Sequence, residues 1–248
     1  MKPEEYRIMG EVEDRHWWYV GHHHLFLSIL EEHCPGAARG RVLDAGCGTG
    51  GFMGRMRERF QPELLVGLDV SEEALRFCRE RGLPDTRCCS IEEIPFSDGS
   101  FDLVLSFNVI CHEAVSDDRG AVREMARVLG PGGWLLLNLP AFDILRGSHD
   151  AAVGGARRYR APGVRRLLED AGLQPVLLTY FNTTLFPLAV AWRLWSRRRA
   201  SSEEVRSDLW APAFLNGALV ALLRMEERLA LRRGLPFGVS LVALARCP

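Results

Sequence analysis

A glycine-rich segment at residues 42–51, Val-Leu-Asp-Ala-Gly-Cys-Gly-Thr-Gly-Gly, constrains the fold of this chain more than any other stretch. An apolar run ends at Asp44, four glycines fall within residues 46–51, and a helical pattern begins at Phe52. Glycine permits a tight strand-to-helix turn and a close approach of backbone to a ligand. The unpaired N–H groups at the start of the next helix add hydrogen-bond donors. The sequence therefore predicts a nucleotide-like ligand across this turn.

Two ligands are compatible with these glycines. The spacing of Gly46, Gly48 and Gly51 fits the dinucleotide fingerprint, whose ligand is a pyrophosphate. The spacing from Asp44 to Gly50 also fits D-x-G-x-G-x-G, whose ligand carries a cationic sulfonium and amino group. A carboxylate at Asp44 repels the first and attracts the second. Asp44 therefore favours S-adenosylmethionine and makes a nicotinamide-dependent oxidoreductase the weaker alternative.

A second acid follows at the expected distance. Asp69 ends the apolar run that begins at Leu64 and lies 19 residues after Gly50, where an acid that binds ribose hydroxyls is expected. The alternative is that Asp69 caps the next helix, but Ser71 already fills that position. We expect Asp69 to bind the ribose.

Two further segments complete a familiar order of motifs, Ile-Pro-Phe-Ser-Asp-Gly-Ser-Phe-Asp-Leu-Val at 94–104 and Leu-Gly-Pro-Gly-Gly at 129–133. With these blocks, over roughly residues 40–180, the chain resembles the class I S-adenosylmethionine-dependent methyltransferases, in particular the methyltransferase 11 type. The resemblance implies S-adenosyl-L-methionine as cofactor, S-adenosyl-L-homocysteine as its product, and a Rossmann-like sheet of seven strands with the last one antiparallel.

The hydrophobic pattern predicts the same α/β, doubly wound architecture, because short apolar runs alternate with helical periods. We expect an N-terminal helical lid at 1–36, a cofactor-binding domain at 37–183 and 236–248, and a helical insertion at 184–235. Strands are expected at 41–45, 64–69, 85–89, 101–107, 133–139, 173–180 and 239–245. Helices are expected at 14–33, 51–60, 72–81, 118–129, 162–171, 184–196 and 212–231.

Composition agrees with a soluble globular enzyme of the cytoplasm. The formal net charge is −1, which is unlike a nucleic-acid binder. The seven cysteines form no C-x-x-C pair, which suits free thiols in a reducing compartment. The polar start argues against a signal peptide, and the absence of a long apolar window argues against a membrane span. We expect a monomer or homodimer.

The helical stretch within 184–199 carries Trp192, Trp195 and a basic end at 197–199. These features are compatible with peripheral contact to a membrane surface. A helical cap over the sheet edge, or a dimer contact, is the plainer alternative.

The N-terminal segment holds five histidines between residues 16 and 33. Consecutive histidines at 22–24 point in different directions on a helix, and no zinc-helix motif accompanies them, so we expect no metal site. The family resemblance instead implies an aromatic helix, with Trp17–Tyr19, that covers the cofactor. His22–His24 replace its basic cluster, which would make any contact with the cofactor carboxylate pH-sensitive. Core packing is the alternative for the tryptophans.

The resemblance also implies the cofactor-binding residues. At the adenine end Ser90 stands where the family has an acid, and a neutral hydroxyl is the weaker acceptor. The backbone N–H of Ile91 would still reach the ring. The full set implied is Asp44, Gly46, Cys47, Gly48, Gly50, Asp69, Val70, Ser90, Ile91, Asn108, Trp18 and Tyr19.

His112 follows the expected strand 101–107 and is the candidate general base, since its free pKa lies near neutrality. A packing role beneath the cofactor is the alternative, because alignment can supply most of the rate in methyl transfer. The resemblance to one subgroup implies acceptor contacts from His149, Arg158, Tyr159 and Asn182. Ala156 stands near a histidine of that subgroup.

The sequence therefore predicts transfer of a methyl group from S-adenosylmethionine to a hydroxyl, or an amine, of a small metabolite in secondary-metabolite, sugar or lipid modification. The alternative is a non-catalytic cofactor-binding or regulatory protein that keeps the fold. Ser90, Ala156 and His22–His24 support that alternative.

Overall fold

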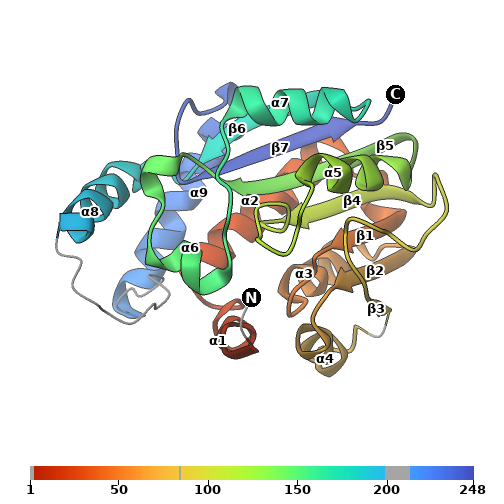
Figure 1. Ribbon diagram of the computed structural model, residues 1–248, viewed down its shortest axis with the longest axis horizontal. Coiled ribbons are helices and arrows are strands. Elements are labelled where there is room, and N and C mark those ends of the chain that lie inside the picture. The colour runs from red at the N-terminus through yellow and green to blue at the C-terminus, as the bar shows by residue number, and fades with distance from the viewer. Residues whose placement is uncertain (1–2, 84, 199–212) are drawn as a thin grey trace.

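The computed structural model describes residues 3–83, 85–198 and 213–248, and its centre is a mixed β-sheet (Figure 1). Within these residues the strand order is β3-β2-β1-β4-β5-β7-β6. Strand β7 runs antiparallel to β5 and β6, and the other pairs are parallel. This confirms the predicted Rossmann-like sheet with an antiparallel last strand. The strands are β1 (Arg41–Ala45), β2 (Leu64–Asp69), β3 (Thr86–Cys88), β4 (Phe101–Phe107), β5 (Leu129–Pro140), β6 (Gln174–Phe181) and β7 (Ser240–Arg246).

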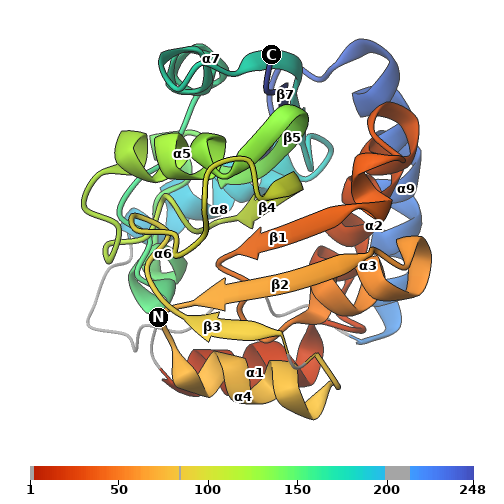
Figure 2. The same cartoon turned by 90° about the vertical axis from the view of Figure 1, so that its right-hand side faces the viewer.

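Helices cover both faces of the sheet (Figure 2). One face packs against α2, α3 and α9, and the other against α5 and α7. The helices are α1 (Pro3–Val12), α2 (Trp17–His33), α3 (Gly51–Phe60), α4 (Glu72–Glu80), α5 (Asp118–Arg127), α6 (Ser148–Val153), α7 (Ala161–Asp170), α8 (Phe186–Arg198) and α9 (Asn216–Arg233), with 3-10 turns η1 (Ala37–Arg39), η2 (Asp143–Leu145) and η3 (Ala213–Leu215).

The N-terminal region differs from its prediction. The helix expected at 14–33 begins only at Trp17, and a separate helix, α1, precedes it. The break lies at His16, whose backbone is extended and whose Nδ1 accepts the N–H of Trp18 at 3.4 Å. This side chain caps the new helix, which is why the two helices do not merge.

Helices α8 and α9 lie between β6 and β7, where the insertion at 184–235 is predicted. Residues 199–212, which include the last residue of the stretch considered for membrane contact, lie outside the described residues. The division into lid, domain and insertion stays a prediction. Within the described part of the chain, no helix combines the length and apolarity needed to cross a bilayer.

The ends of three strands hold strained residues at one edge of the sheet. Asn108 follows β4, Phe142 follows β5 closely, and Asn182 follows β6, with φ of 59°, 50° and 62°. Left-handed backbone in residues other than glycine costs free energy and gathers at functional sites. Because β4, β5 and β6 run in the same direction, the three residues mark the carboxyl edge, where ligands bind in such sheets.

The packing of α2 on α9 depends on a small residue. A Cβ at Gly21 would lie 2.3 Å from Leu223 Cδ1, so this close approach requires glycine. We predict that Gly21→Ala lowers the free energy of unfolding by about 1–3 kcal/mol, the usual cost of overpacking a core. Urea denaturation followed by circular dichroism measures the change.

Gly54→Ala in α3 is the matched control, since a Cβ there would meet no atom within 4 Å. It should raise the free energy of unfolding by about 0.5–1 kcal/mol, because alanine favours a helix over glycine. Equal effects of the two substitutions would contradict the packing of α2 on α9.

Candidate active site

The glycine loop between β1 and α3 is fixed to the end of β2. The N–H groups of Gly46 and Cys47 both donate to the carbonyl of Leu68, each at 2.8 Å. Gly46, Gly48 and Gly50 have φ of 95°, 54° and 80°, which glycine adopts without strain. The predicted tight turn is confirmed.

The loop also touches the turn that follows β4. A Cβ on Gly46 would lie 2.2 Å from Val109 Cγ2, so only glycine allows this contact. The glycine loop and the turn after β4, which holds Asn108 and His112, are therefore neighbours in space. Methyl transfer requires such a neighbourhood, because donor and acceptor must be aligned within contact distance.

Asp69 is the hydrogen-bond centre of the site and is 8% exposed. Its Oδ2 accepts the N–H of Gly48 at 3.0 Å, and its Oδ1 accepts the N–H of Ser71 at 3.0 Å. Oδ1 also accepts the hydroxyl of Tyr6 at 3.2 Å. Ser71 itself caps α4 through Ala74, as predicted. Asp69 thus joins the glycine loop, the start of α4 and the N-terminal helix.

Three buried carboxyl groups, those of Asp44, Asp69 and Glu13, surround the loop, and the pKa values of Asp44 and Glu13 are raised. Asp44 is 2% exposed, and burial, followed by the charges of Asp69 and Glu13, raises its pKa to about 7. Burial also raises the pKa of Glu13, while the hydroxyl of Thr49 and the guanidinium of Arg81 oppose the shift. Arg81 Nη2 lies 2.8 Å from Glu13 Oε1. Within the described residues, Asp44 and Asp69 have no ion-pair partner.

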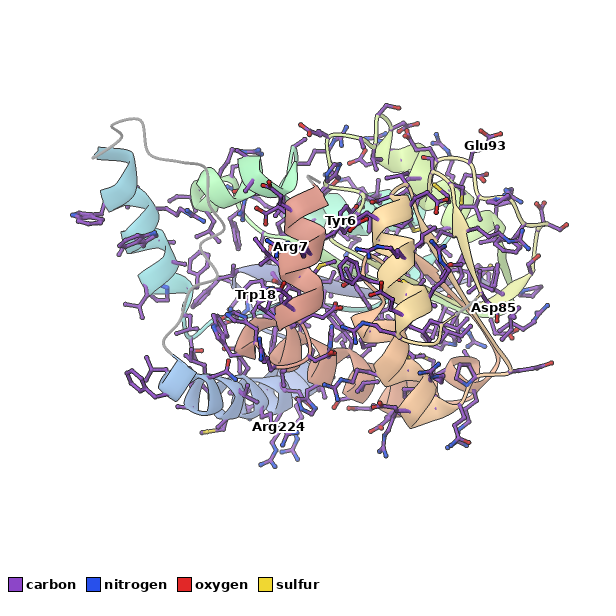
Figure 3. All side chains as sticks on the ribbon, turned by 90° about the horizontal axis from the view of Figure 1, so that it is seen from below. Tyr6, Arg7, Trp18, Asp85, Glu93 and Arg224 are labelled. Atoms are coloured by element: carbon purple, nitrogen blue, oxygen red, sulfur yellow. The ribbon has the colours of Figure 1, made fainter. Side chains whose placement is uncertain are left out.

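Helix α1 lies directly on the glycine loop, beside α4 (Figure 3). A Cβ on Gly48 would lie 2.7 Å from Met9 Cε, and a Cβ on Gly51 would lie 2.3 Å from Glu13 Oε2. Glu13 also accepts a hydrogen bond from Thr49 Oγ1. Sequence analysis missed these contacts, although Tyr6, Met9 and Glu13 follow the i, i+3, i+7 spacing of one helix face.

The aromatic residues of α2 take two directions. The ring of Trp18 packs on that of His22, with centroids 4.4 Å apart. The ring of Tyr19 faces that of His23, with centroids 6.4 Å apart, and burial, followed by the charges of Glu13 and Glu5, raises the pKa of Tyr19. The contact of Trp18 and Tyr19 with a cofactor stays a prediction.

The expectation of a pH-sensitive histidine cluster is wrong for His22 and His23, because both are buried. Burial lowers the pKa of His22 to about 4 and that of His23 to about 3, so both rings are neutral near pH 7. His22 contacts the carbonyl of Trp18 at 2.7 Å and Ser240 Oγ at 3.0 Å. His24 pairs with Arg224 Nη2 at 2.8 Å. Within the part of the chain described, no three histidine, cysteine or acidic side chains are placed to hold one metal ion.

The predicted adenine end lies beyond β2 and β3. Val70 is 58% exposed, whereas the side chain of Ile91 is 4% exposed and belongs to the core. Ser90 Oγ accepts the N–H of Glu92 at 3.1 Å and opens a turn there. The thiol of Cys47 lies 3.9 Å from that of Cys78. Adenine binding by Val70, Ser90 and Ile91 stays a prediction.

Asparagines line the carboxyl edge on the acceptor side. Asn138 Nδ2 donates to Asn108 Oδ1 at 3.3 Å, which links the ends of β5 and β4. Asn138 and Asn182 are 2% and 1% exposed, and the Oδ1 atom of each has no hydrogen-bond partner. A buried unpaired acceptor costs free energy, so these two atoms indicate where a polar ligand or a water binds. Asn182 was predicted from sequence and Asn138 was not.

His112 lies in the turn after β4, but both ring nitrogens are engaged. Its Nδ1 accepts the N–H of Ala114 at 3.0 Å, and the ring also bonds the backbone of Val153. Burial is the main cause that lowers its pKa below the ordinary value. His112 is therefore neutral near pH 7, and to act as a base it must release a hydrogen bond. The catalytic role of His112 stays a prediction.

Arg158 and Tyr159, the predicted acceptor contacts, have structural partners. Arg158 makes a two-pronged ion pair with Asp150 at 2.9 and 3.0 Å and donates to the carbonyl of Ala141 at 2.8 Å. The hydroxyl of Tyr159 donates to Asp118 Oδ2 at 2.8 Å. These bonds fix α6 and the segment after it. His149 belongs to α6, and its side chain lies outside the described residues. Contacts of these three residues with an acceptor stay predictions.

Comparison with known proteins identifies the domain. Residues 43–137 match the family model described as "Methyltransferase domain". This chain carries a class I S-adenosylmethionine-dependent methyltransferase domain. The matched residues run from β1 through the middle of β5, so they include the glycine loop, Asp69 and His112. The family predicted from sequence is confirmed.

Curated relatives differ in the acceptors that their names state. A fatty-acid O-methyltransferase of Mycolicibacterium smegmatis is 35% identical over 138 residues, 54% of this chain and 44% of the relative. A probable S-adenosylmethionine-dependent methyltransferase of the same organism is 31% identical over 173 residues, which are 68% of this chain and 64% of the relative. Probable tRNA methyltransferase 9B of Mus musculus is 35% identical over 116 residues, which are 46% of this chain and 24% of the relative. The chain spans less than two thirds of each of these relatives.

Solved structures share the fold. The chain is similar to a complex between the Haloferax volcanii Trm112 methyltransferase activator and a methyltransferase, with a TM-score of 0.64, 21% identity, and coverage of 99% of this chain and 94% of that one. A neighbour named as the [4+2]-cyclase SpnF matches at a TM-score of 0.58 and 23% identity, over 90% of this chain and 80% of that one. The fold therefore also occurs in a protein that is named for a different reaction.

The residues of this site fit the cationic donor of the family. Asp44, Asp69 and Glu13 place three carboxyl groups around the glycine loop, and only Glu13 has a cationic partner among the described residues. A sulfonium and an amino group would be attracted by these carboxyl groups. A pyrophosphate would be repelled by them, which disfavours the nicotinamide alternative.

The pKa of Asp44 near 7 predicts a pH-dependent affinity for S-adenosylmethionine. A cation favours the ionised carboxylate, so binding should release a proton below pH 7, and affinity should rise from pH 6 to pH 8. One pH unit below this pKa, the cost of ionising Asp44 weakens binding about tenfold. Isothermal titration calorimetry in buffers of different ionisation enthalpy measures both effects.

Asp44→Asn is the control, because it removes the titrating group and should flatten the pH profile. S-adenosylhomocysteine, which lacks the sulfonium charge, should show a weaker dependence. An unchanged slope in Asp44→Asn would remove Asp44 from the donor site.

The hydrogen bond from Tyr6 to Asp69 predicts that the Tyr6 hydroxyl and the ribose hydroxyls compete for this carboxylate. A carboxylate offers about four acceptor positions, and Gly48, Ser71 and Tyr6 fill three of them. One position is left, so a ribose that donates both of its hydroxyls to Asp69 also needs the position that Tyr6 holds. We predict that Tyr6→Phe strengthens S-adenosylhomocysteine binding by about fivefold, the value of one net hydrogen bond.

Asp69→Ala should instead weaken the same binding by about 1.5–3 kcal/mol, since it removes a charged partner. Gly48→Val should block binding, because its φ is positive and Met9 covers it. Weaker binding by Tyr6→Phe would show that the Tyr6 hydroxyl assists the ligand rather than competing with it.

Proposed function

We propose that this protein transfers the methyl group of S-adenosylmethionine to an oxygen of a small organic acceptor, with an amine as the alternative nucleophile. The observation that carries the proposal is the contact of the acid-lined glycine loop with the turn after β4, through Gly46 and Val109. This contact would set a bound donor beside the carboxyl edge where Asn138 and Asn182 hold unpaired acceptors.

The bound donor supplies a methyl carbon that is already activated by its sulfonium. The residues of the chain then have to hold the donor and orient the acceptor toward it. We assign the donor to Asp44, Gly46, Cys47, Gly48, Gly50, Asp69, Val70, Ser90, Ile91 and Asn108, and add Met9 of α1, while the Tyr6 hydroxyl yields its place at Asp69 to the ribose. In this assignment residues 1–36 form the lid, and α1 is its covering element. Alignment of the two reactants provides most of the acceleration.

The acceptor's proton has to leave when a neutral hydroxyl attacks. His112 is the nearest predicted base to the donor loop in sequence, and its neutral ring can take that proton through Nδ1 once Ala114 releases it. Asn182 and Asn138 would bind a polar group of the acceptor. We place the enzyme in the cytoplasm, since its seven cysteines are free thiols.

A methyl-transfer assay tests the proposal. The protein is incubated with methyl-labelled S-adenosylmethionine and a panel of carboxylic acids, alcohols and amines, and label in the extracted product is counted. Label should enter at least one small acceptor with the wild type and not with Asp69→Ala. His112→Ala should lower the rate about 10²–10⁴-fold if His112 is the base.

The pH profile gives the second readout. Because burial lowers the pKa of His112, the wild-type rate should rise with pH up to a value below 6.5 and stay level above it. His33→Ala, at the far end of α2, is the control and should keep the rate. If the rate of His112→Ala falls by less than tenfold, His112 is not the base and alignment of donor and acceptor is the source of catalysis.

A non-catalytic cofactor-binding protein is the second candidate, and the hydrogen bond that occupies Nδ1 of His112 favours it. It predicts tight binding of S-adenosylhomocysteine without label transfer to any acceptor, transfer RNA included. Label in transfer RNA alone would instead replace the small acceptor of the first proposal.

A further inference from the structure

The turn between β4 and α5, residues 108–117, is joined by hydrogen bonds to a second segment of the chain. That segment, residues 154–157, lies between α6 and α7 (Figure 1). The carbonyl of Cys111 accepts the N–H groups of Ala156 and Arg157 at 2.8 and 3.0 Å. The β4–α5 turn therefore has a fixed neighbour on the side where the acceptor contacts are predicted.

The side chain of Arg157 adds four hydrogen bonds to the same turn. Its Nη1 donates to the carbonyls of Val115, His112 and Ile110 at 2.9, 3.3 and 3.4 Å, and its Nη2 donates to the carbonyl of Ser116 at 3.1 Å. Among the described residues no acid forms an ion pair with this guanidinium. A guanidinium carries its N–H donors in a rigid fork, so these bonds fix the carbonyls relative to one another.

An acid holds the opposite side of the turn. Glu92 Oε1 accepts the N–H groups of Ser116 and Asp117 at 3.1 and 2.8 Å and the hydroxyl of Ser116 at 2.6 Å. The hydroxyl of Ser116 and the N–H of Asp117 lower the pKa of Glu92. Ser116 thus gives its N–H to Glu92 and its carbonyl to Arg157. The turn is held between a carboxylate on the adenine side and a guanidinium on the acceptor side.

The start of the turn leaves little room for movement. Val109 lies against Gly46 so closely that only a glycine fits there, and Asn108 has a φ of 59°. A residue other than glycine stays in this backbone region only where its surroundings hold it. The hydrogen bonds of Arg157 to the rest of the turn are part of those surroundings.

We propose that Arg157 is a positioning residue for methyl transfer. By holding the carbonyls of the β4–α5 turn, its guanidinium sets Asn108 and His112 against the glycine loop and thereby aligns the acceptor with the methyl group. The inference rests on the proposed function and adds a residue to it. Arg157 itself touches neither reactant. A misplacement of about 1 Å costs a reaction of this kind about 10²-fold in rate, so loosening of the turn is measurable.

A direct ion pair between Arg157 and a carboxylate of the acceptor is the competing role. Nη1 and Nη2 already donate to four carbonyls, so an ion pair through these atoms would have to break bonds that hold the turn. Positioning is favoured for this reason. The two roles differ in kinetics, because a lost ion pair raises the KM for the acceptor, whereas a lost alignment lowers kcat.

Steady-state kinetics of Arg157→Ala test the proposal, with the small acceptor that takes up label from the wild type. The value of kcat should fall about 10–100-fold, while the KM for the acceptor changes by less than about twofold. Arg157→Lys keeps the charge but gathers its donors on one nitrogen, so its kcat should also fall, by about tenfold. Arg166→Ala is the matched control, since Arg166 is an exposed arginine of α7, and it should keep the rate.

Calorimetric titration with S-adenosylhomocysteine separates positioning from a loss of folded protein. In both Arg157 variants the stoichiometry should stay near one and the Kd within about twofold of the wild type, because the glycine loop is fixed by β2 rather than by Arg157. Added methylguanidinium should restore part of the rate of Arg157→Ala, and methylammonium should not, because only the first carries a fork of donors.

Three results would overturn the proposal. A wild-type kcat in Arg157→Ala or Arg157→Lys would show that the turn does not need the guanidinium. A fall in kcat matched by an equal fall in the stoichiometry of S-adenosylhomocysteine binding would leave Arg157 a purely structural role. A raised KM for the acceptor at constant kcat would make Arg157 a direct contact of the acceptor.

Amide hydrogen exchange gives a readout that does not depend on activity. Peptides covering residues 110–116 should exchange faster in Arg157→Ala than in the wild type, while peptides covering the glycine loop, residues 46–51, should not change. If the wild type transfers label and Arg157→Ala transfers it equally well, this inference alone fails. If the wild type transfers no label to any acceptor, the proposed function fails, and a difference in exchange then assigns Arg157 only a structural role.

Discussion

The Asp69 carboxylate is the interaction on which the rest of the site depends. It sits at the end of β2 and accepts hydrogen bonds from the glycine loop through Gly48, from α4 through Ser71, and from α1 through Tyr6. Three segments that are far apart in sequence share one buried charge. A buried carboxylate requires such donors, because an unpaired charge away from water is very costly. The glycine loop and helix α1, which covers it, are therefore both hydrogen-bonded to the carboxylate oxygens of Asp69.

The two sides of the carboxyl edge differ in chemistry, and that difference suits two unlike reactants. Around the glycine loop three carboxyl groups gather, and the pKa values of Asp44 and Glu13 rise, which favours a cation as their partner. Toward β6, the other side holds two buried amide oxygens without hydrogen-bond partners and a group of packed aromatic rings.

Sequence reasoning succeeded where local signals are strong. The bounds of β1, β2, β4 and α3 match the prediction, because apolar runs and glycines punctuate these segments. It failed at α1, since the role of Tyr6 depends on a carboxylate 63 residues away. It also missed α6, a short helix held by an ion pair rather than by its own periodicity. Arg158, whose contact with an acceptor stays a prediction, supplies that pair with Asp150.

The central claim is that the acid-lined loop binds a sulfonium donor rather than a dinucleotide. The most direct measurement is the thermal unfolding midpoint with S-adenosylmethionine, compared with nicotinamide adenine dinucleotide at the same concentration. At about 100 times the Kd, S-adenosylmethionine should raise the midpoint by roughly 5–10 °C, since binding to the folded state alone stabilises a chain of this size by that amount. The dinucleotide should leave it unchanged. A rise with the dinucleotide and none with S-adenosylmethionine would contradict the account.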